Sequence, residues 1–111
     1  MDNCIFCKII AGEIPSTKEY EDDNYIAIRD VNPQAPIHVL VMPKHHVANI
    51  LEADPGLVAG AFRVVKIVAD KLGMREDGLR VVSNVGEFGC QSVKHLHIHL
   101  LGGAQLKDNM G

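Results

Sequence analysis

The sequence has no long hydrophobic run, no excess of basic residues and few cysteines. No apolar stretch approaches the about 20 residues that a membrane-spanning helix needs, so we expect no membrane partner. The sequence contains eleven Lys and Arg residues and fourteen Asp and Glu residues, which gives a formal net charge of −3. This balance argues against broad nucleic-acid binding, which normally requires a basic patch, but it allows a local basic site for one phosphate.

The three cysteines are an odd number, and the first residues lack the basic segment and apolar run of a secretory signal. We therefore expect no disulfide framework, and a reducing cytoplasm is the expected compartment. With 111 residues, 47% of them hydrophobic, the chain can bury a modest core. It shows no repeat, low-complexity tract or linker, so the sequence predicts a single domain over 1–111.

Turn residues and apolar periodicity predict a short series of helices and strands. In chain order these are a short helix at 4–10, a hairpin at 20–29, a strand at 38–42, a long helix at 55–72, a strand at 79–83 and a strand at 93–101. A proline-containing loop at 31–36 and a glycine-containing loop at 84–92 separate some of them. Hairpins and long loops favour antiparallel pairing, so the predicted fold is α+β, with about five antiparallel strands, one long helix and one short helix.

The long helix has clear boundary signals and an unusually wide apolar face. Asp54 can cap its N-terminus, Pro55 suits the first helical position, and Gly73 can end it. Its polar side is a single stripe made by Arg63, Lys66 and Asp70. Such a helix is expected to be covered on two sides, and in so small a protein the second cover could be another subunit.

Three histidines, His95, His97 and His99, alternate with aliphatic residues near the C-terminus. In a strand, side chains two positions apart share a face, so all three imidazoles should project from one side. Neighbours about 6.6–6.8 Å apart could share a metal ion. The outer pair, about 13 Å apart, cannot both reach one zinc with Zn–N bonds of about 2.0–2.1 Å. The alternatives are nucleophilic or acid–base catalysis, which suits a group that titrates near neutrality, and a merely solvated polar face.

The loop at 84–92 leads directly into the predicted histidine strand. Its glycines permit turns that aim several backbone N–H groups inward, and Asn84, Gln91 and Ser92 add neutral hydrogen-bond donors. This equipment could hold a phosphate beside a histidine. Taken alone, an ordinary turn between two strands is an equally good interpretation.

These residues together resemble the histidine-triad (HIT) family, and in particular its branch of histidine-triad nucleotide-binding proteins. The resemblance rests on the His-x-His-x-His motif at 95–99 followed by two apolar residues. Further segments that resemble this branch are 5–10, 13–15, 20–23, 32–36, 42–44, 91–93 and 102–103.

The resemblance implies a homodimer with a sheet that continues across the two subunits. It also implies hydrolysis of purine nucleoside phosphoramidates and related nucleotidyl conjugates. The middle histidine, His97, would attack the α-phosphorus to form a nucleotidyl-histidine intermediate, and water would release the nucleoside monophosphate, AMP or GMP.

The resemblance also assigns further residues by position. His99 would contact the phosphate or leaving group, and His38 would support the cluster from a neighbouring strand. Charge on the phosphate oxygens would be stabilised by the loop amides and by the loop side chains. The residues matching the binding positions are Asn84, Gln91, Ser92 and Cys90 for the phosphate, Phe6, Ile9, Ile14 and Ile28 for the base, and Asp30 with Val31 for the ribose. The plainer interpretations are that Phe6 and Ile9 are core residues and that Asp30 is a turn residue.

Two positions depart from the family pattern. Cys90 stands where the branch usually has a second glycine after Gly89, and a side chain restricts positive φ at such a position. The tail at 104–111 lacks the tryptophan found in some relatives, so a leaving-group preference carried by that tail cannot be transferred.

Cys4 and Cys7 have the two-residue gap typical of zinc ligands, although one such pair is a weak signal. The resemblance implies a structural Zn²⁺ held by Cys4, Cys7, His46 and His95, a chemically complete set. His45 competes with His46 for this role, and spacing alone does not exclude it. The plainer interpretation is a pair of free, partly buried thiols.

Two alternatives to the hydrolase remain open on the sequence. One is a nucleotide-binding regulatory or scaffold dimer whose residual catalysis is incidental. The other is a dinucleoside polyphosphate hydrolase or nucleotidyltransferase, which would need room for a longer phosphate chain.

Overall fold

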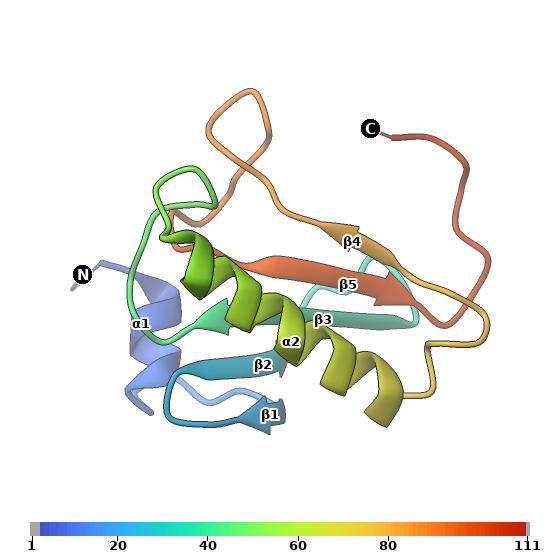
Figure 1. Ribbon diagram of the computed structural model, residues 1–111, viewed down its shortest axis with the longest axis horizontal. Coiled ribbons are helices and arrows are strands. Elements are labelled where there is room, and N and C mark those ends of the chain that lie inside the picture. The colour runs from blue at the N-terminus through green and yellow to red at the C-terminus, as the bar shows by residue number, and fades with distance from the viewer. Residues whose placement is uncertain (1–2, 111) are drawn as a thin grey trace.

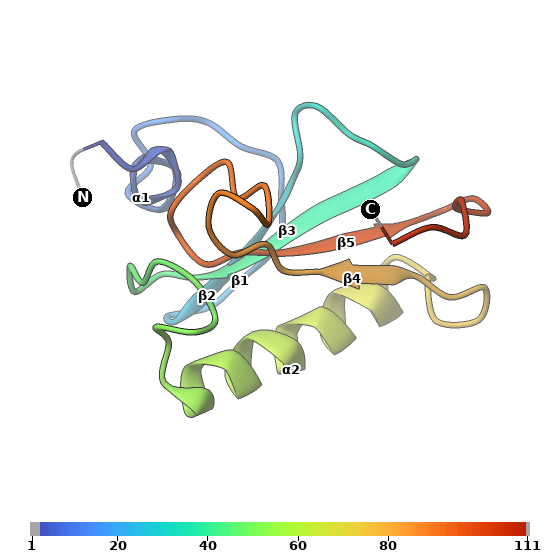
Figure 2. The ribbon, with the colours of Figure 1, turned by 90° about the horizontal axis from the view of Figure 1, so that it is seen from above.

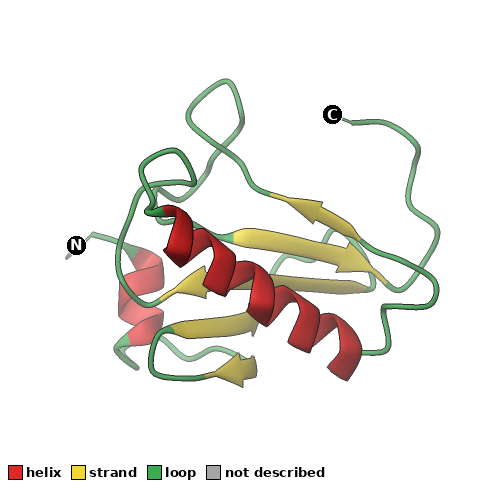
Figure 3. Ribbon diagram, in the orientation of Figure 1, coloured by secondary structure: helices red, strands yellow, loops and turns green. Residues whose placement is uncertain are grey.

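The computed structural model describes residues 3–110, and residues 1, 2 and 111 of the expected domain lie outside that range. A single five-stranded sheet organises the chain (Figures 1 and 3). Its elements are α1 (Ile5–Ile10), β1 (Lys18–Glu21), β2 (Tyr25–Arg29), β3 (Ile37–Pro43), α2 (Pro55–Lys71), β4 (Arg80–Val82) and β5 (Ile98–Gly102). The strand order is β1-β2-β3-β5-β4 with every neighbouring pair antiparallel, which confirms the predicted α+β class.

The two helices lie on opposite faces of the sheet (Figure 2). Under α2, residues such as Val64, Val68, Val39 and Leu100 form one buried cluster. On the other face, α1 covers a second cluster, whose members are Phe6, Ile9, Ile26, Ile28, Leu40 and Met42. The sheet is therefore covered on both sides, and the α1 face carries the histidines described below.

Local chemistry sets the ends of α2 where the sequence predicts them. The Asp54 carboxylate accepts a hydrogen bond from the Gly56 N–H at 2.9 Å, and Pro55 occupies the first helical position. After the last turn, Gly73 takes a φ of +68°, which lets the chain leave the helix without steric conflict. None of the helices within residues 3–110 combines the length and hydrophobicity needed to cross a membrane.

The final strand is shorter than predicted. It begins at Ile98 rather than at position 93, so His95 and His97 precede the regular ladder. Two backbone carbonyls in this region are bonded by histidine side chains instead of by strand N–H groups. His95 bonds the Pro43 carbonyl, and His97 bonds the carbonyl of His95. The Leu96 N–H instead donates to the Val47 carbonyl at 2.7 Å. Successive side chains still alternate between the two faces of the sheet. Ile98 packs under α2, while His97 and His99 lie together on the α1 side.

Candidate active site

His97 lies buried on the α1 face of the sheet, where it packs against Phe6 of α1. Its Nδ1 lies 2.7 Å from the backbone carbonyl of His95, and a carbonyl only accepts, so Nδ1 carries the proton. The lone pair of His97 is therefore on Nε2. Burial lowers the pKa of His97, and this effect outweighs the opposing effects of the hydrogen bond and of Asp30. A neutral imidazole with a free Nε2 lone pair is the form of histidine that can act as a nucleophile.

His99 and His38 come from adjacent strands and meet beside His97. The register of β3 and β5 pairs Leu40 with His99, which puts His38 and His99 diagonally on the same face. His38 Nε2 lies 2.9 Å from His99 Nδ1 and 3.4 Å from the Asp30 carboxylate. Burial, followed by the neighbouring imidazoles, lowers the pKa of His99 to about 4. His99 is therefore neutral at pH 7.

The loop at 84–92 uses part of its side-chain hydrogen-bonding capacity on itself. The Asn84 amide donates to the Gly89 carbonyl at 2.7 Å, and the Gly86 N–H donates to the Gln91 side chain at 3.0 Å. The Gln91 amide also donates to the Ala48 carbonyl at 2.6 Å, which ties this loop to the one after β3. These side chains therefore shape the loop, while the exposed Ser92 hydroxyl is the more accessible polar group.

Cys90 adopts the backbone conformation that a glycine would favour, with a φ of 61°. Left-handed backbone costs a residue with a side chain about 1 kcal/mol relative to glycine. Glycine also adds unfolded-chain entropy, which offsets part of the gain. We therefore expect Cys90→Gly to exceed Cys90→Ala in unfolding free energy by about 0.5 kcal/mol, measured by urea denaturation. The alanine variant controls for loss of the thiol, and equal stability of the two would contradict a strained Cys90.

Among the predicted base and ribose residues, Phe6 and Asp30 contact histidines of the site. Phe6, Ile9 and Ile28 belong to the buried cluster under α1, and Ile14 packs against it. Phe6 also places its ring edge-on to His97, with ring centroids 5.0 Å apart. The Asp30 carboxylate accepts a hydrogen bond from the Asn32 N–H at 2.9 Å, and Val31 is 97% exposed. Phe6 is thus both a core residue and a neighbour of His97.

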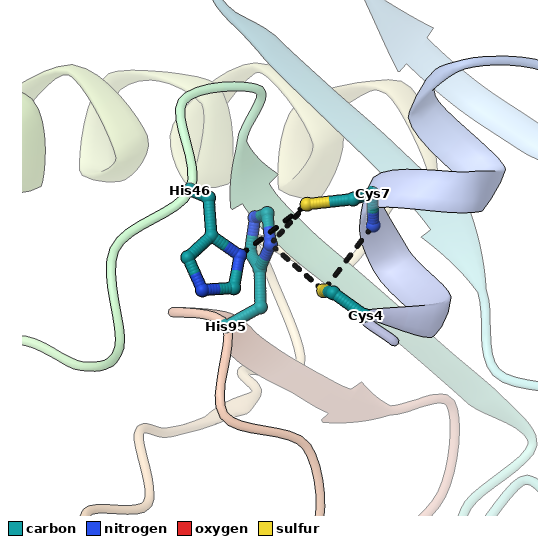
Figure 4. Close-up of side chains that lie close together, drawn as sticks. All are labelled: Cys4, Cys7, His46 and His95. Carbon is teal, nitrogen blue, oxygen red and sulfur yellow. Dashed lines mark hydrogen bonds between the residues drawn. The ribbon is translucent and has the colours of Figure 1, made fainter. Parts of the chain in front are cut away.

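A second constellation joins Cys4, Cys7, His46 and His95 (Figure 4). Cys7 Sγ lies 3.3 Å from His46 Nδ1, and Cys4 Sγ lies 3.4 Å from His95 Nδ1. Tetrahedral zinc with Zn–S of about 2.3 Å and Zn–N of about 2.0–2.1 Å separates sulfur and nitrogen ligands by about 3.6 Å. The four side chains therefore fit a structural zinc ion. His45, the competing residue, is exposed and outside this cluster.

The protonation of His95 also suits a metal ligand. Its Nε2 lies 2.9 Å from the Pro43 carbonyl and so carries the proton, which leaves the Nδ1 lone pair facing the two thiols. A metal-binding histidine typically donates its other ring N–H to such an acceptor. Sequence reasoning did not find these backbone partners, because the Pro43 and His95 carbonyls carry no side-chain signal.

The comparisons with known proteins match this architecture. The family model described as HIT domain matches residues 11–106. The chain belongs to the HIT domain family. It is 50% identical over 107 residues to a 14 kDa zinc-binding protein of Zea mays, covering 92% of this chain and 83% of that protein.

Two further relatives extend the comparison. Adenylylsulfatase HINT1 of Arabidopsis thaliana is 43% identical over 107 residues, which covers 92% of this chain and 72% of that protein. The crystal structure of a HIT family hydrolase from Legionella pneumophila Philadelphia 1 superposes with a TM-score of 0.94 at 46% identity. That superposition covers 98% of this chain and 100% of the Legionella chain.

Proposed function

We propose that this protein hydrolyses purine nucleoside phosphoramidates or related nucleotidyl conjugates through a covalent nucleotidyl-His97 intermediate. The observation that carries the proposal is the hydrogen bond from His97 Nδ1 to the His95 carbonyl, which leaves a buried Nε2 lone pair on a neutral ring. The names of two relatives support this proposal: one is called a HIT family hydrolase, and the other is called an adenylylsulfatase, which names an adenylyl conjugate.

The reaction divides into two displacements at phosphorus. In the first, His97 Nε2 forms a bond to the α-phosphorus while the P–N bond to the leaving amine breaks and that amine takes a proton from solvent. In the second, a water oxygen forms the new P–O bond and gives up a proton to solvent, the bond between His97 Nε2 and phosphorus breaks, and AMP or GMP leaves with neutral His97 restored. The amides of the 84–92 loop and the Ser92 hydroxyl would stabilise charge on the phosphate oxygens.

The remaining site residues would hold the nucleoside. The apolar residues around Phe6 would contact the purine, and the Asp30 carboxylate would bind the two ribose hydroxyls. The direct test incubates the wild-type protein with an adenosine or guanosine phosphoramidate and follows both the monophosphate product and the intact protein mass. Turnover with an added nucleotidyl mass supports the proposal. Nucleotide binding without turnover or adduct would favour the regulatory alternative.

We also propose that Cys4, Cys7, His46 and His95 hold a structural Zn²⁺ in the cytoplasm, where the thiols stay reduced. The closed Cys₂His₂ set leaves no position for substrate, so the ion would supply cross-linking rather than catalysis. It would join α1, the loop after β3 and the segment before β5. The name of the maize relative is consistent with this proposal.

We further propose a homodimer formed through β4 and the outer side of α2. β4 is an edge strand of the sheet, so its free edge can pair with the same strand of a second copy. Three large apolar residues are exposed along this side: Phe62 (42%), Ile67 (37%) and Val81 (40%). In a two-fold symmetric dimer, the interface would bury these three residues of both subunits.

Sedimentation velocity tests the dimer. We expect the wild type to sediment as a dimer and Phe62→Lys/Ile67→Lys to sediment as a monomer. Two buried charges per subunit should raise the dissociation constant at least about 100-fold. Leu51→Lys, which alters a 77% exposed residue on the loop after β3, is the matched control and should stay dimeric. A wild-type monomer, or a dimeric double variant, would contradict the proposed interface.

A further inference from the structure

Asp30, His38 and His99 form a cluster whose ligand atoms all lie within 4.8 Å of one another. Two imidazoles and a carboxylate could hold a divalent ion, or they could form a chain of hydrogen bonds. The two arrangements place protons differently. A metal ligand needs a lone pair on His38 Nε2, whereas a hydrogen-bond chain needs a proton there.

One backbone group decides between these arrangements. The N–H of Gln34 donates to His38 Nδ1 at 3.0 Å. A backbone N–H cannot accept, so His38 Nδ1 must carry the lone pair. The proton of neutral His38 is therefore on Nε2, and burial favours this neutral form by lowering the pKa of His38. With its proton on Nε2, His38 is a donor in this cluster and not a metal ligand.

The position of this proton determines the tautomer of His99. His38 Nε2 is 2.9 Å from His99 Nδ1, a normal hydrogen-bond distance, and it is the donor of this pair. His99 Nδ1 must accept, which leaves the His99 proton on its own Nε2. His97 has the opposite arrangement, because the His95 carbonyl holds its proton on Nδ1. Two neighbouring histidines are thus held in opposite tautomers, each determined by a single backbone group.

We propose that the backbone amide of Gln34, acting through His38, fixes His99 as an Nε2–H donor and prevents it from serving as a second nucleophile. In the hydrolase proposed above, on which this role for His99 rests, the Nε2–H of His99 would donate to the phosphate or the leaving group. The loop that carries Gln34, between Asp30 and His38, has restricted backbone conformations. Prolines precede Gln34 and follow it by two positions, and the Asp30 N–H ties the loop base to the His38 carbonyl at 3.0 Å.

Nitrogen NMR tests the tautomers without any turnover, so its result is independent of the proposed reaction. Long-range ¹H–¹⁵N correlation spectra of the histidine side chains at neutral pH report which ring nitrogen carries the proton. We expect Nε2–H for His38 and His99 and Nδ1–H for His97. An Nδ1–H signal for His99, or an even mixture of its tautomers, would overturn the proposal.

Substitutions of Gln34 test whether its backbone N–H sets the tautomers of His38 and His99. Gln34→Pro removes the N–H, whereas Gln34→Ala keeps it and removes only the side chain, which bonds the Asn32 carbonyl. We expect Gln34→Ala to retain the wild-type tautomers and Gln34→Pro to give mixed tautomers at His38 and His99. If the protein is a hydrolase, kcat of the proline variant should fall about tenfold below that of the alanine variant, with KM within twofold.

A second pair of variants keeps the test decisive if Gln34→Pro does not fold. His38→Gln retains an N–H that can reach His99 Nδ1, whereas His38→Leu retains the volume without a donor. We expect the glutamine variant to preserve the Nε2–H signal of His99 and the leucine variant to lose it. An unchanged His99 signal in folded His38→Leu would show that His38 does not set this tautomer.

Discussion

Replacing His97 with alanine is expected to abolish turnover of a nucleoside phosphoramidate, lowering kcat by about four to six orders of magnitude. The variant loses the only atom proposed to bond phosphorus, so neither displacement can proceed by the same route. Stabilisation of phosphate charge by the loop remains, and it accounts for any residual rate. The measurement pairs steady-state kinetics with intact-mass analysis, in which the nucleotidyl adduct of the wild type should be absent from the variant.

His97→Asn separates the chemistry from the architecture. The asparagine amide can still donate to the His95 carbonyl, which accepts from His97 at 2.7 Å, but it has no nucleophilic nitrogen. We expect this variant to bind AMP within about threefold of the wild-type dissociation constant and to remain as inactive as His97→Ala. Sustained turnover in either folded variant, or an adduct on another residue, would remove His97 from its proposed role.

The sequence predicts the fold well where the determining interactions are local. The Asp54 cap and Gly73 set the ends of the long helix, and both depend only on neighbouring residues. Alternation also predicts that the triad histidines face away from the aliphatic core. It does not predict where hydrogen-bonded pairing begins, because side-chain bonds to the Pro43 and His95 carbonyls replace ladder bonds before Ile98.

The candidate site depends more heavily on tertiary structure. Spacing leaves His45 and His46 as equal candidates beside the two cysteines, and only the path of the chain after β3 brings His46 to Cys7. The Gln34 N–H is a further example, since every residue except proline carries one. A sequence therefore gives no sign that this particular amide contacts a histidine. The sequence therefore provides candidate side chains for the site, but it does not indicate the backbone groups that fix their protonation.

The second large effect is expected from Cys4→Ala/Cys7→Ala, which should lose stoichiometric zinc and destabilise the fold. Structural zinc provides about 10–16 kcal/mol of apparent binding free energy in small peptides that fold only with metal. Here the cluster under α2 forms a core that does not depend on the metal, so a smaller loss of about 3–5 kcal/mol is expected. At about 4–8 °C per kcal/mol for small domains, Tm should fall by more than about 10 °C.

Metal content by mass spectrometry and Tm by calorimetry give two independent measurements of this effect. Cys90→Ala is the matched control, because Cys90 is an exposed cysteine outside the four-residue cluster. It should keep one zinc per chain and a Tm within a few degrees of the wild type. A wild-type protein that is metal-free when purified without chelator, or a double variant that keeps its zinc, would exclude the site.

Loss of zinc should also affect His97, because His95 belongs to both proposed sites. Its Nδ1 faces the two thiols, its Nε2–H donates to the Pro43 carbonyl, and its own carbonyl holds the proton of His97. Releasing the imidazole of His95 from the metal loosens the peptide that fixes the His97 tautomer. We therefore expect the double cysteine variant to lose about tenfold in kcat at temperatures where it is still folded. Added zinc should restore chelator-treated wild type but not the variant, whereas equal kcat in all forms would mean that the two sites are uncoupled.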